Sequence, residues 1–221
     1  MHNIHKYCTN GQDIIVDLTK SAPNQFKPFP RIYDLCDYWK VKGYKEIIDI
    51  GCGYLRNSLV FVDYFRLWIC DYPQQMQSQV FSKRLSCLKA HRNFMGIIEP
   101  HQLPYERLKV DAVVLAYVIH TLPEEKMRIE IIDNAIRNTK HPHEIFIAVP
   151  NGERYYRQHM NASNKFNDGH LRNAGNGRKT FYRGYSAEEI DCFMEQHFNY
   201  MKLDKSFGAS KKNQRIYKCK N

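Results

Sequence analysis

Two glycines and a cysteine follow directly after a short apolar run, in the stretch EIIDIGCG over residues 46–53. Glycine has no Cβ, so Gly51 and Gly53 allow a sharp turn and a close approach of a ligand to the backbone. The next apolar run ends in Asp71, 18 residues past Gly53. A carboxylate at about that distance accepts hydrogen bonds from ribose hydroxyls in dinucleotide-binding proteins. The pattern favours a nucleotide-like ligand, with an ordinary strand exit and a solvated acid as the alternative.

Two other nucleotide-binding patterns are excluded by the residues after the glycines. A nicotinamide-binding turn has the pattern Gly-x-Gly-x-x-Gly, which would require a glycine at position 56, where this chain has Arg56. A phosphate-binding P-loop requires Gly-Lys-Ser or Gly-Lys-Thr, and neither tripeptide occurs in the chain. The glycine turn is therefore either an ordinary strand exit or a ligand site of another class.

Short apolar runs alternate with helix-length segments, which is typical of strand–helix units around a largely parallel sheet. Strands are predicted over 45–50, 67–71, 93–98, 111–118, 144–149, 200–206 and 215–219. Helices are predicted over 31–41, 57–65, 74–90, 124–138 and 186–198. The last of these helices starts with a capping box, formed by Ser186 and by Glu189 three residues later. In open parallel sheets ligands bind over the carboxyl ends of the strands, where the glycine turn and Asp71 stand.

Several motifs occur in a fixed order between residues 45 and 149. They are Asp49-Ile50-Gly51-Cys52-Gly53, the strand-ending Asp71, the segment His101-Gln102-Leu103-Pro104, the strand-opening Asp111, and the segment His120-Thr121-Leu122-Pro123. In order and spacing they resemble the motifs of the class I S-adenosylmethionine-dependent methyltransferases. The chain departs from that family at two places: Leu55 stands where a third glycine is common, and a His101-Gln102 pair replaces an acid that often follows the third strand.

The resemblance implies a fold and a domain organisation. The expected fold is α/β, a Rossmann-like class I methyltransferase fold with a mostly parallel seven-stranded sheet and helices on both faces. Residues 1–44 are expected to form an N-terminal helical cap, and residues 45–221 the methyltransferase domain. A polar segment at about 150–185 is too long for a plain connection, and we expect it to be an insertion on the substrate side.

The resemblance also implies the cofactor, S-adenosyl-L-methionine, with S-adenosyl-L-homocysteine as the product. The turn from Gly51 through Cys52 to Gly53 would pass beneath the methionine part, and Asp49 would act near its amino group. Asp71 would bind the ribose. The remaining implied cofactor neighbours are Tyr72 beside the adenine, His101 or Gln102 at the adenine edge, and Ala116 in the strand over 111–118. For Tyr72, simple coverage of the sheet edge is the alternative.

The chain is expected to be an enzyme that transfers a methyl group to an oxygen or nitrogen acceptor. A general base is needed only where the acceptor must lose a proton. The candidates follow the strands over 111–118 and 144–149, and they are Tyr117, His120 and Glu153. His120 has the most suitable titration range, with packing against the next helix as its alternative role.

The insertion carries the residues that are expected to meet the acceptor. Its seven arginines and lysines outnumber two acids, and aromatic residues are interleaved among them. Arginine suits phosphates or carboxylates, and aromatic rings stack on bases. The candidate substrate-binding residues are Asn151, Arg154, Tyr155, Arg157 and Arg183. A solvated basic loop is the alternative.

Three functions are compatible with these features. The first is a methyltransferase for a small anionic molecule, and the second is a methyltransferase for RNA or DNA that uses the basic aromatic insertion. The third is a non-catalytic binding module that kept the fold. An Asn/Asp-Pro-Pro-Tyr motif and a Pro-Cys dipeptide are both missing, which disfavours adenine-N6 and cytosine-C5 methylation of DNA.

Composition sets further limits. The 221 residues carry 33 Lys and Arg against 23 Asp and Glu, a net charge of +10 that suggests an anionic partner. The seven cysteines contain no Cys-x-x-Cys pair, so we expect reduced thiols, no disulfide framework and no metal site. No apolar run of about 18 residues occurs, and the amino terminus does not resemble a secretion signal. A cytoplasmic protein that does not interact with membranes is expected, and its oligomeric state stays open.

Overall fold

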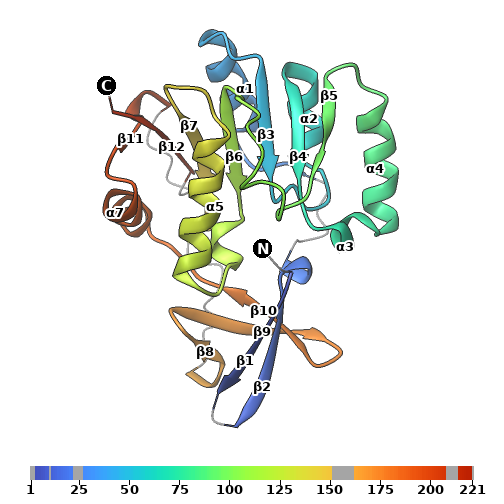
Figure 1. Ribbon diagram of the computed structural model, residues 1–221, viewed down its shortest axis with the longest axis vertical. Helices are drawn as coiled ribbons and strands as arrows, with labels where there is room; N and C mark the ends of the chain where they lie inside the picture. Colours follow the sequence, from blue (N-terminus) through green and yellow to red (C-terminus); the bar gives the residue numbers. More distant parts are fainter. Residues whose placement is uncertain (1–2, 10, 22–26, 151–161, 208–213, 221) are drawn as a thin grey trace.

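The computed structural model of the protein describes residues 3–9, 11–21, 27–150, 162–207 and 214–220. They form two sheets, one of seven strands and one of five (Figure 1). The larger sheet has the strand order β11-β12-β7-β6-β3-β4-β5. Its strands are β3 (Glu46–Ile50), β4 (Arg66–Cys70), β5 (Phe94–Ile98), β6 (Ala112–Ala116), β7 (Glu144–Ala148), β11 (Met201–Leu203) and β12 (Gln214–Cys219).

Along the sheet, the neighbouring strands β5, β4, β3, β6 and β7 run parallel. Strand β12 is antiparallel to both β7 and β11. All seven predicted strands are present, but the one predicted over 200–206 is shorter, because β11 ends at Leu203 and a 3-10 helix begins at Lys205. Every residue of β6 and β7 is buried, because central parallel strands are covered on both faces and carry continuous apolar runs. The predicted mostly parallel seven-stranded sheet is confirmed.

Helices cover both faces of this sheet. They are α1 (Ile32–Val41), α2 (Ser58–Tyr64), α3 (Pro73–Met76), α4 (Gln79–Lys89), α5 (Glu125–Arg137) and α7 (Ala187–His197), with the short 3-10 helices η1 (Leu18–Ser21), η2 (Ile119–Thr121), η3 (Ala162–Asn164) and η4 (Lys205–Phe207). Trp39 of α1, Phe61 of α2 and Leu88 of α4 belong to one hydrophobic core. Ile131 of α5 and Phe193 of α7 belong to a second core. The sheet therefore separates two apolar layers, as the expected fold requires.

The helix predicted over 74–90 is divided in two. Ser78 has an extended backbone between α3 and α4, and its side-chain oxygen accepts a hydrogen bond from the N–H of Phe81 at 3.2 Å. Serine is a strong N-cap because its hydroxyl replaces a missing intrahelical partner. Ser78 therefore begins a new helix instead of continuing the first one. The predicted capping box of Ser186 and Glu189 is present at the start of α7.

The expectation of a helical amino-terminal segment is wrong for its first part. Strands β1 (Ile4–Thr9) and β2 (Gln12–Asp17) pair antiparallel, and among the described residues before 45 the α-helix is α1 alone. The turn contains Gly11 at φ 73°, and the β-branched run Ile14-Ile15-Val16 favours a strand. The chain then enters η1, which ends at Ser21.

The described part of the 150–185 segment is a sheet rather than a loop. It contains β8 (Lys165–Phe166), β9 (Gly169–Gly175) and β10 (Arg178–Tyr182), and the strand order is β1-β2-β10-β9-β8. Strand β10 pairs with β9 antiparallel and with β2 parallel. The hairpin turn has Asn176 at φ 52° and Gly177 at φ 71°, as tight hairpin turns require. Two segments far apart in sequence thus build one five-stranded sheet.

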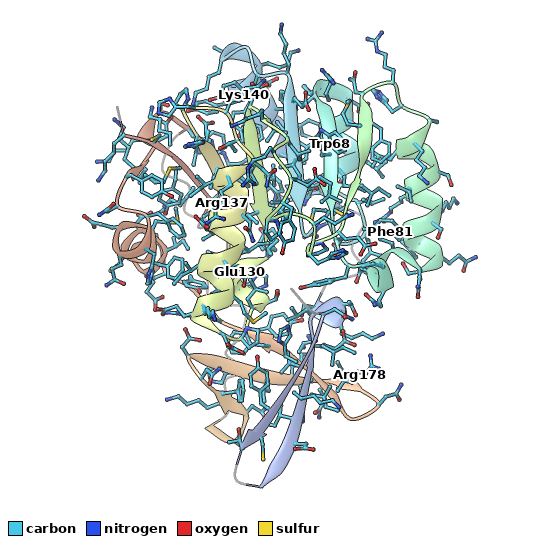
Figure 2. All side chains as sticks on the ribbon, in the orientation of Figure 1. Trp68, Phe81, Glu130, Arg137, Lys140 and Arg178 are labelled. Atoms are coloured by element: carbon cyan, nitrogen blue, oxygen red, sulfur yellow. The ribbon has the colours of Figure 1, made fainter. Side chains whose placement is uncertain are left out.

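The five-stranded sheet lies against the carboxyl ends of the parallel strands. Strand β10 contacts both η1 and η2, and η2 follows the carboxyl end of β6. Figures 1 and 2 show the smaller sheet below the larger one, with Arg178 projecting from it. This edge of the larger sheet is where the sequence predicts a ligand. Among the described helices, none is long and apolar enough to cross a membrane.

Candidate functional site

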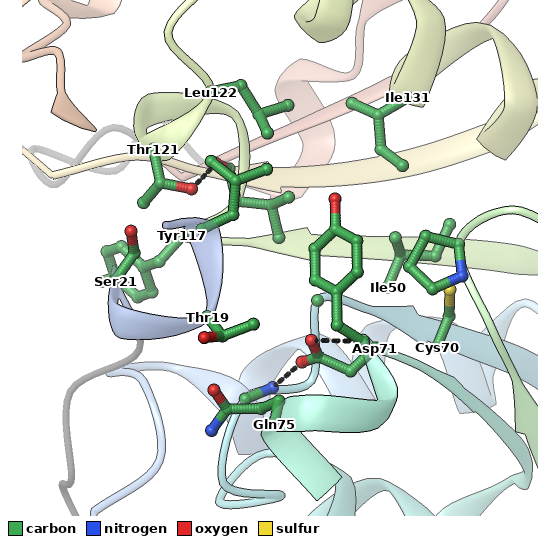
Figure 3. A pocket seen from close by; sticks show the side chains of 16 residues that line it. Thr19, Ser21, Ile50, Cys70, Asp71, Gln75, Tyr117, Thr121, Leu122 and Ile131 are labelled. Carbon is green, nitrogen blue, oxygen red and sulfur yellow. Dashed lines mark hydrogen bonds between the residues drawn. The ribbon is translucent and has the colours of Figure 1, made fainter. Parts of the chain in front are cut away.

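A cavity opens at the carboxyl ends of β3 and β4 (Figure 3). Its floor includes Gly51, Gly53 and Asp71. Leu18, Thr19 and Ser21 of η1 form a further wall, which we call the η1 wall, and Tyr117, Leu122 and Ile131 also line the space. The cavity thus joins the predicted glycine turn and acid to a segment from the amino-terminal hairpin.

The glycine turn has the geometry that only glycine adopts easily. Gly51 has φ 69°, and its N–H donates to the Cys70 carbonyl oxygen at 2.7 Å. A Cβ at this position would lie 2.5 Å from Cγ2 of Val118. Gly53 has φ 56°. Positive φ strains residues that have a side chain. Both positions therefore favour glycine for conformation, and position 51 also lacks the space for a Cβ.

Asp71 is held by the same turn. One carboxylate oxygen accepts a hydrogen bond from the N–H of Gly53 at 2.6 Å, and the other accepts one from the N–H of Tyr72 at 2.8 Å. Burial raises the pKa of Asp71 to about 6, against the opposing effect of the two backbone N–H groups. A carboxylate has about four lone-pair sites, so Asp71 retains acceptor capacity toward a ligand in the cavity even with a further hydrogen bond from the Cys52 thiol.

Asp49 and Cys52 lie close to the turn but do not line the cavity. The Asp49 side chain is buried and accepts a hydrogen bond from the Ser58 hydroxyl at 2.7 Å. Burial raises the pKa of Asp49 to about 7, although the Ser58 hydrogen bond acts in the opposite direction. Cys52 is also buried, and burial raises the pKa of its thiol well above the usual range. Neither side chain is placed to contact a ligand directly.

The predicted adenine-side residues divide into two groups. Tyr72 lines the cavity directly after Asp71. His101 and Gln102 are exposed and do not line it. His101 lies 3.2 Å from a carboxylate oxygen of Glu99, and the Gln102 side-chain oxygen accepts the Glu99 N–H at 2.8 Å. The His101-Gln102 pair thus closes the turn after β5, and the structure does not bring it to the cavity.

Tyr117 follows the last residue of β6, Ala116, which is buried and not part of the cavity lining. Tyr117 does line the cavity and has φ 62°, an uncommon conformation for a residue with a side chain. Its N–H donates to the Ala148 carbonyl oxygen at 2.8 Å, and the Arg56 guanidinium carbon lies 5.7 Å from its ring centroid. Such conformations gather at functional sites, which supports Tyr117 as a site residue.

His120 is buried behind the cavity lining, with its ring centroid 6.2 Å from that of Tyr117 and 5.9 Å from that of Tyr182. Burial lowers its pKa to about 3, so the imidazole is neutral at physiological pH. Its Nδ1 has no hydrogen-bond partner among the described residues. A base of such low proton affinity is weak, and these features favour the packing role.

Of the predicted substrate-binding residues, Arg183 alone lies in the part of the chain that the structure describes. Arg183 lies 2.5 Å from an oxygen of Asp168 and 3.9 Å from one of Glu189, and its guanidinium carbon is 4.4 Å from the Tyr185 ring centroid. It does not line the cavity. The other predicted residues of this segment lie outside the described residues, namely Asn151, Glu153, Arg154, Tyr155 and Arg157.

The cavity-lining residues that sequence reasoning missed include Leu18, Thr19 and Ser21 in η1, and Gln75 in α3. The Ser21 hydroxyl oxygen and the Gln75 Nε2 are buried without a hydrogen-bond partner in the described structure. No local signal marks η1, because its position depends on the pairing of β2 with β10. The position of Gln75 in the cavity wall likewise depends on the fold and has no local signal. No group of three potential metal-ligating side chains occurs in the described part of the chain.

Comparison of the fold identifies methyltransferases as structural neighbours. A S-adenosylmethionine-dependent methyltransferase from Clostridium acetobutylicum aligns at a TM-score of 0.61 and 9% identity, over 88% of this chain and 93% of the other. A SAM-dependent methyltransferase from Methanosarcina mazei aligns at 0.59 and 14%, over 87% and 98%. Magnesium protoporphyrin IX methyltransferase from Synechocystis, solved with bound SAH, aligns at 0.56 and 12%, over 85% and 80%.

No protein-family model and no curated protein sequence matches the chain. The identities to the structural neighbours are low, so these alignments speak to the fold. The protein has the class I methyltransferase fold, as the motifs between residues 45 and 149 predict.

Proposed function

We propose that the protein is an S-adenosylmethionine-dependent methyltransferase that transfers a methyl group to an oxygen or nitrogen atom of a small anionic molecule. The observation that carries the proposal is the cavity at the carboxyl ends of β3 and β4. There Asp71 accepts the N–H of Gly53, and both residues line the same space. In this fold, ligands bind at that edge of the sheet.

The residues of the cavity fit such a cofactor. Gly51 and Gly53 line the cavity with backbone alone, so a ligand can approach the chain closely at this turn. Asp71 retains lone pairs that suit ribose hydroxyls, and the buried Ser21 Oγ and Gln75 Nε2 lack a partner within the described structure. An adenosine moiety offers hydrogen-bonding groups to both.

When bound, S-adenosylmethionine supplies a methyl group already activated on a sulfonium. The chain then has to align the acceptor with that group and exclude water. Leu18, Leu122 and Ile131 supply apolar walls. Tyr117 lines the cavity where β6 ends, and we assign it a contact to the reacting groups. His120, neutral and buried behind Tyr117, supports its ring and is not the preferred general base.

The net charge of +10 fits an anionic acceptor of any size, and two further observations favour a small one. The η1 wall lines one side of the cavity, and a compact acceptor fits beside it more easily than a duplex does. Two structural neighbours carry names that point to small acceptors, magnesium protoporphyrin IX methyltransferase and the mitomycin 7-O-methyltransferase MmcR. The candidate acceptor-binding residues remain Arg183 and those of the segment over 151–157.

A nucleic-acid acceptor is the second candidate, because basic residues are exposed on the five-stranded sheet. Lys165, Arg172 and Arg178 are all exposed there. Basic side chains bind phosphates and release counterions, so such binding weakens steeply with salt.

The experiment that tests the proposal follows a labelled methyl group. The purified protein is incubated with methyl-labelled S-adenosylmethionine in separate reactions. Each reaction contains one acceptor fraction: a small-metabolite extract, total RNA or DNA. We expect label in anionic small molecules. Label in RNA or DNA would favour the second candidate, and binding of S-adenosylhomocysteine without label in any fraction would favour a non-catalytic binding module.

A further inference from the structure

Gln75 has a buried donor that no described residue accepts. It lies in α3, four residues after Asp71, and its side chain is 5% exposed and lines the cavity. Its backbone N–H donates to the Tyr72 carbonyl oxygen at 2.9 Å, which fixes the start of the side chain. The side-chain Nε2 has no hydrogen-bond partner in the described structure. Buried donors are rarely left unpaired, because they lose their bonds to water without replacement.

Gln75 and Asp71 offer complementary chemistry to the same space. Both oxygens of Asp71 already accept backbone N–H groups, from Gly53 at 2.6 Å and from Tyr72 at 2.8 Å. An ionised carboxylate only accepts hydrogen bonds, whereas the Gln75 amide nitrogen only donates. Figure 3 shows Gln75 next to Asp71, with Thr19 above them. A ligand group between the two side chains must therefore both donate and accept.

The opposite side of the cavity carries a second unpaired polar atom. The Ser21 hydroxyl oxygen in η1 is buried without a partner among the described residues. The Tyr182 hydroxyl donates to the Ser21 carbonyl oxygen at 3.4 Å, which helps to hold Ser21 in place. Two unpaired polar atoms in one cavity, from different segments of the chain, indicate a polar ligand rather than an empty apolar space.

We infer that Gln75 is a ligand-binding residue whose Nε2 donates to the oxygen of a ribose hydroxyl of S-adenosylmethionine. The same hydroxyl donates its hydrogen to Asp71. A hydroxyl is the group that donates to a carboxylate and accepts from an amide at once. This inference rests on the proposed function, because it assigns one contact within the proposed cofactor site.

The test compares three ligands on two variants by calorimetric titration. The ligands are S-adenosylhomocysteine and its 2′-deoxy and 3′-deoxy analogues. Gln75→Met keeps the length of the side chain and removes the donor. Gln74→Met is the matched control, because Gln74 belongs to the same short helix, is exposed and does not line the cavity.

We expect Gln75→Met to bind S-adenosylhomocysteine about 10-fold more weakly than the wild type, while Gln74→Met binds it equally well. With one of the two deoxy analogues, the wild type and Gln75→Met should bind within about twofold, because the partner of the amide is then missing. Gln75→Glu keeps the shape of the side chain and replaces the donor by an acceptor. It is the substitute variant if Gln75→Met fails to fold, and we expect the same pattern of affinities from it.

Two results would overturn the inference while the proposed function stands. In one, the Gln75 variants bind S-adenosylhomocysteine as tightly as the wild type. In the other, the Gln75 variants lower the affinity for all three ligands by the same factor. Gln75 would then contact the adenine or support the structure of α3 instead of binding a ribose hydroxyl. A folded wild type that does not bind S-adenosylhomocysteine would instead remove the proposed function, and the Gln75 contact with it.

Discussion

Gly51 has φ 69°, and a Cβ there would lie 2.5 Å from Val118 Cγ2. Gly177 has nearly the same φ, 71°, but nothing lies within 4 Å of its Cβ position. Gly177→Ala should therefore lower the free energy of unfolding by about 1 kcal/mol, through backbone strain alone. Gly51→Ala adds the clash with Val118 and should lower the free energy of unfolding by at least about 2 kcal/mol. Urea denaturation measures both losses. Equal losses in the two variants would show that the contact with Val118 can relax without cost.

The buried Asp49 predicts a pH dependence of stability. Burial raises its pKa from 3.8 to about 7 in the folded state, so the native protein keeps a proton that the unfolded chain has lost. The free energy of unfolding should therefore fall as the pH rises from about 4 to about 7, by at most about 4 kcal/mol from this group.

Asp49→Asn removes this titration and keeps an acceptor for the Ser58 hydroxyl. Urea denaturation at pH 4.5 and pH 7.5 should show a smaller loss of stability with rising pH in Asp49→Asn than in the wild type. Asp71, with a pKa raised to about 6, contributes a loss of the same sign that remains in both proteins. Identical pH slopes would contradict the raised pKa of Asp49.

At the residue scale, the sequence predicts those parts of the site that depend on short-range pattern. The turn at Gly51 and Gly53 and its partner Asp71 follow from residue type and spacing. Gln75 and Ser21 could not be predicted as ligand contacts, because their unpaired state depends on what the fold buries around them. The positive φ of Tyr117 likewise has no signal in its residue type.

At the scale of elements, the amino-terminal hairpin holds the η1 wall against the cavity. Asp17, at the end of β2, is 1% exposed, and one of its oxygens accepts from the Arg178 guanidinium at 2.6 Å. Its other oxygen accepts from the Thr19 N–H at 3.1 Å and from the Thr19 hydroxyl at 2.6 Å. A strand of the insertion thus fixes a cavity-lining residue through one buried carboxylate.

Arg178→Leu should weaken binding of S-adenosylhomocysteine about fivefold, which corresponds to about 1 kcal/mol. Arg178 does not line the cavity, so the effect would arise from a less ordered η1 wall. The loss is modest because the Arg178 side chain is 43% exposed. Calorimetric titration measures it.

Lys179→Leu is the matched control, because Lys179 is the next residue of β10 and its ammonium group donates to Asn173 within the β9–β10 hairpin. It should bind S-adenosylhomocysteine as the wild type does. If both variants bind normally, the hairpin does not order the cavity wall.

The local sequence pattern also explains which strands and helices could be predicted. The parallel strands are continuous apolar runs because both faces of the sheet are covered, and these runs stand out in the sequence. The five-stranded sheet depends on the pairing of Ile15 with Arg178, which links segments far apart in the chain and leaves no local signal. A helical amino terminus was therefore expected where β1 and β2 form.

At the scale of the whole molecule, one ion-pair cluster links the five-stranded sheet to helix α5, which packs on the larger sheet. Arg128 of α5 is 1% exposed, and its guanidinium donates to the Leu122 carbonyl oxygen at 2.8 Å and to Asp168 at 2.5 Å. Arg183 reaches the same Asp168 oxygen at 2.5 Å. Asp168, between β8 and β9, therefore balances the buried positive charge of Arg128 in α5.

Asp168→Asn should lower the free energy of unfolding by about 1–3 kcal/mol, because it leaves the buried Arg128 without a counter-charge. The estimate allows for the partial exposure of Asp168, whose side chain is 35% exposed. Asp13→Asn, at an exposed position of β2, serves as the control and should change little. Equal urea midpoints for the two variants would mean that the five-stranded sheet is held by its apolar contacts alone.

The central claim is that the cavity beside Asp71 binds the adenosine part of S-adenosylmethionine, and calorimetric titration with S-adenosylhomocysteine tests it most directly. The wild type is compared with Asp71→Asn and with Asp37→Asn, an exposed position on α1. We predict micromolar binding by the wild type and by Asp37→Asn, and binding at least about 10-fold weaker by a folded Asp71→Asn. A folded wild type that does not bind, or an Asp71→Asn that binds equally well, would contradict the assignment of this site.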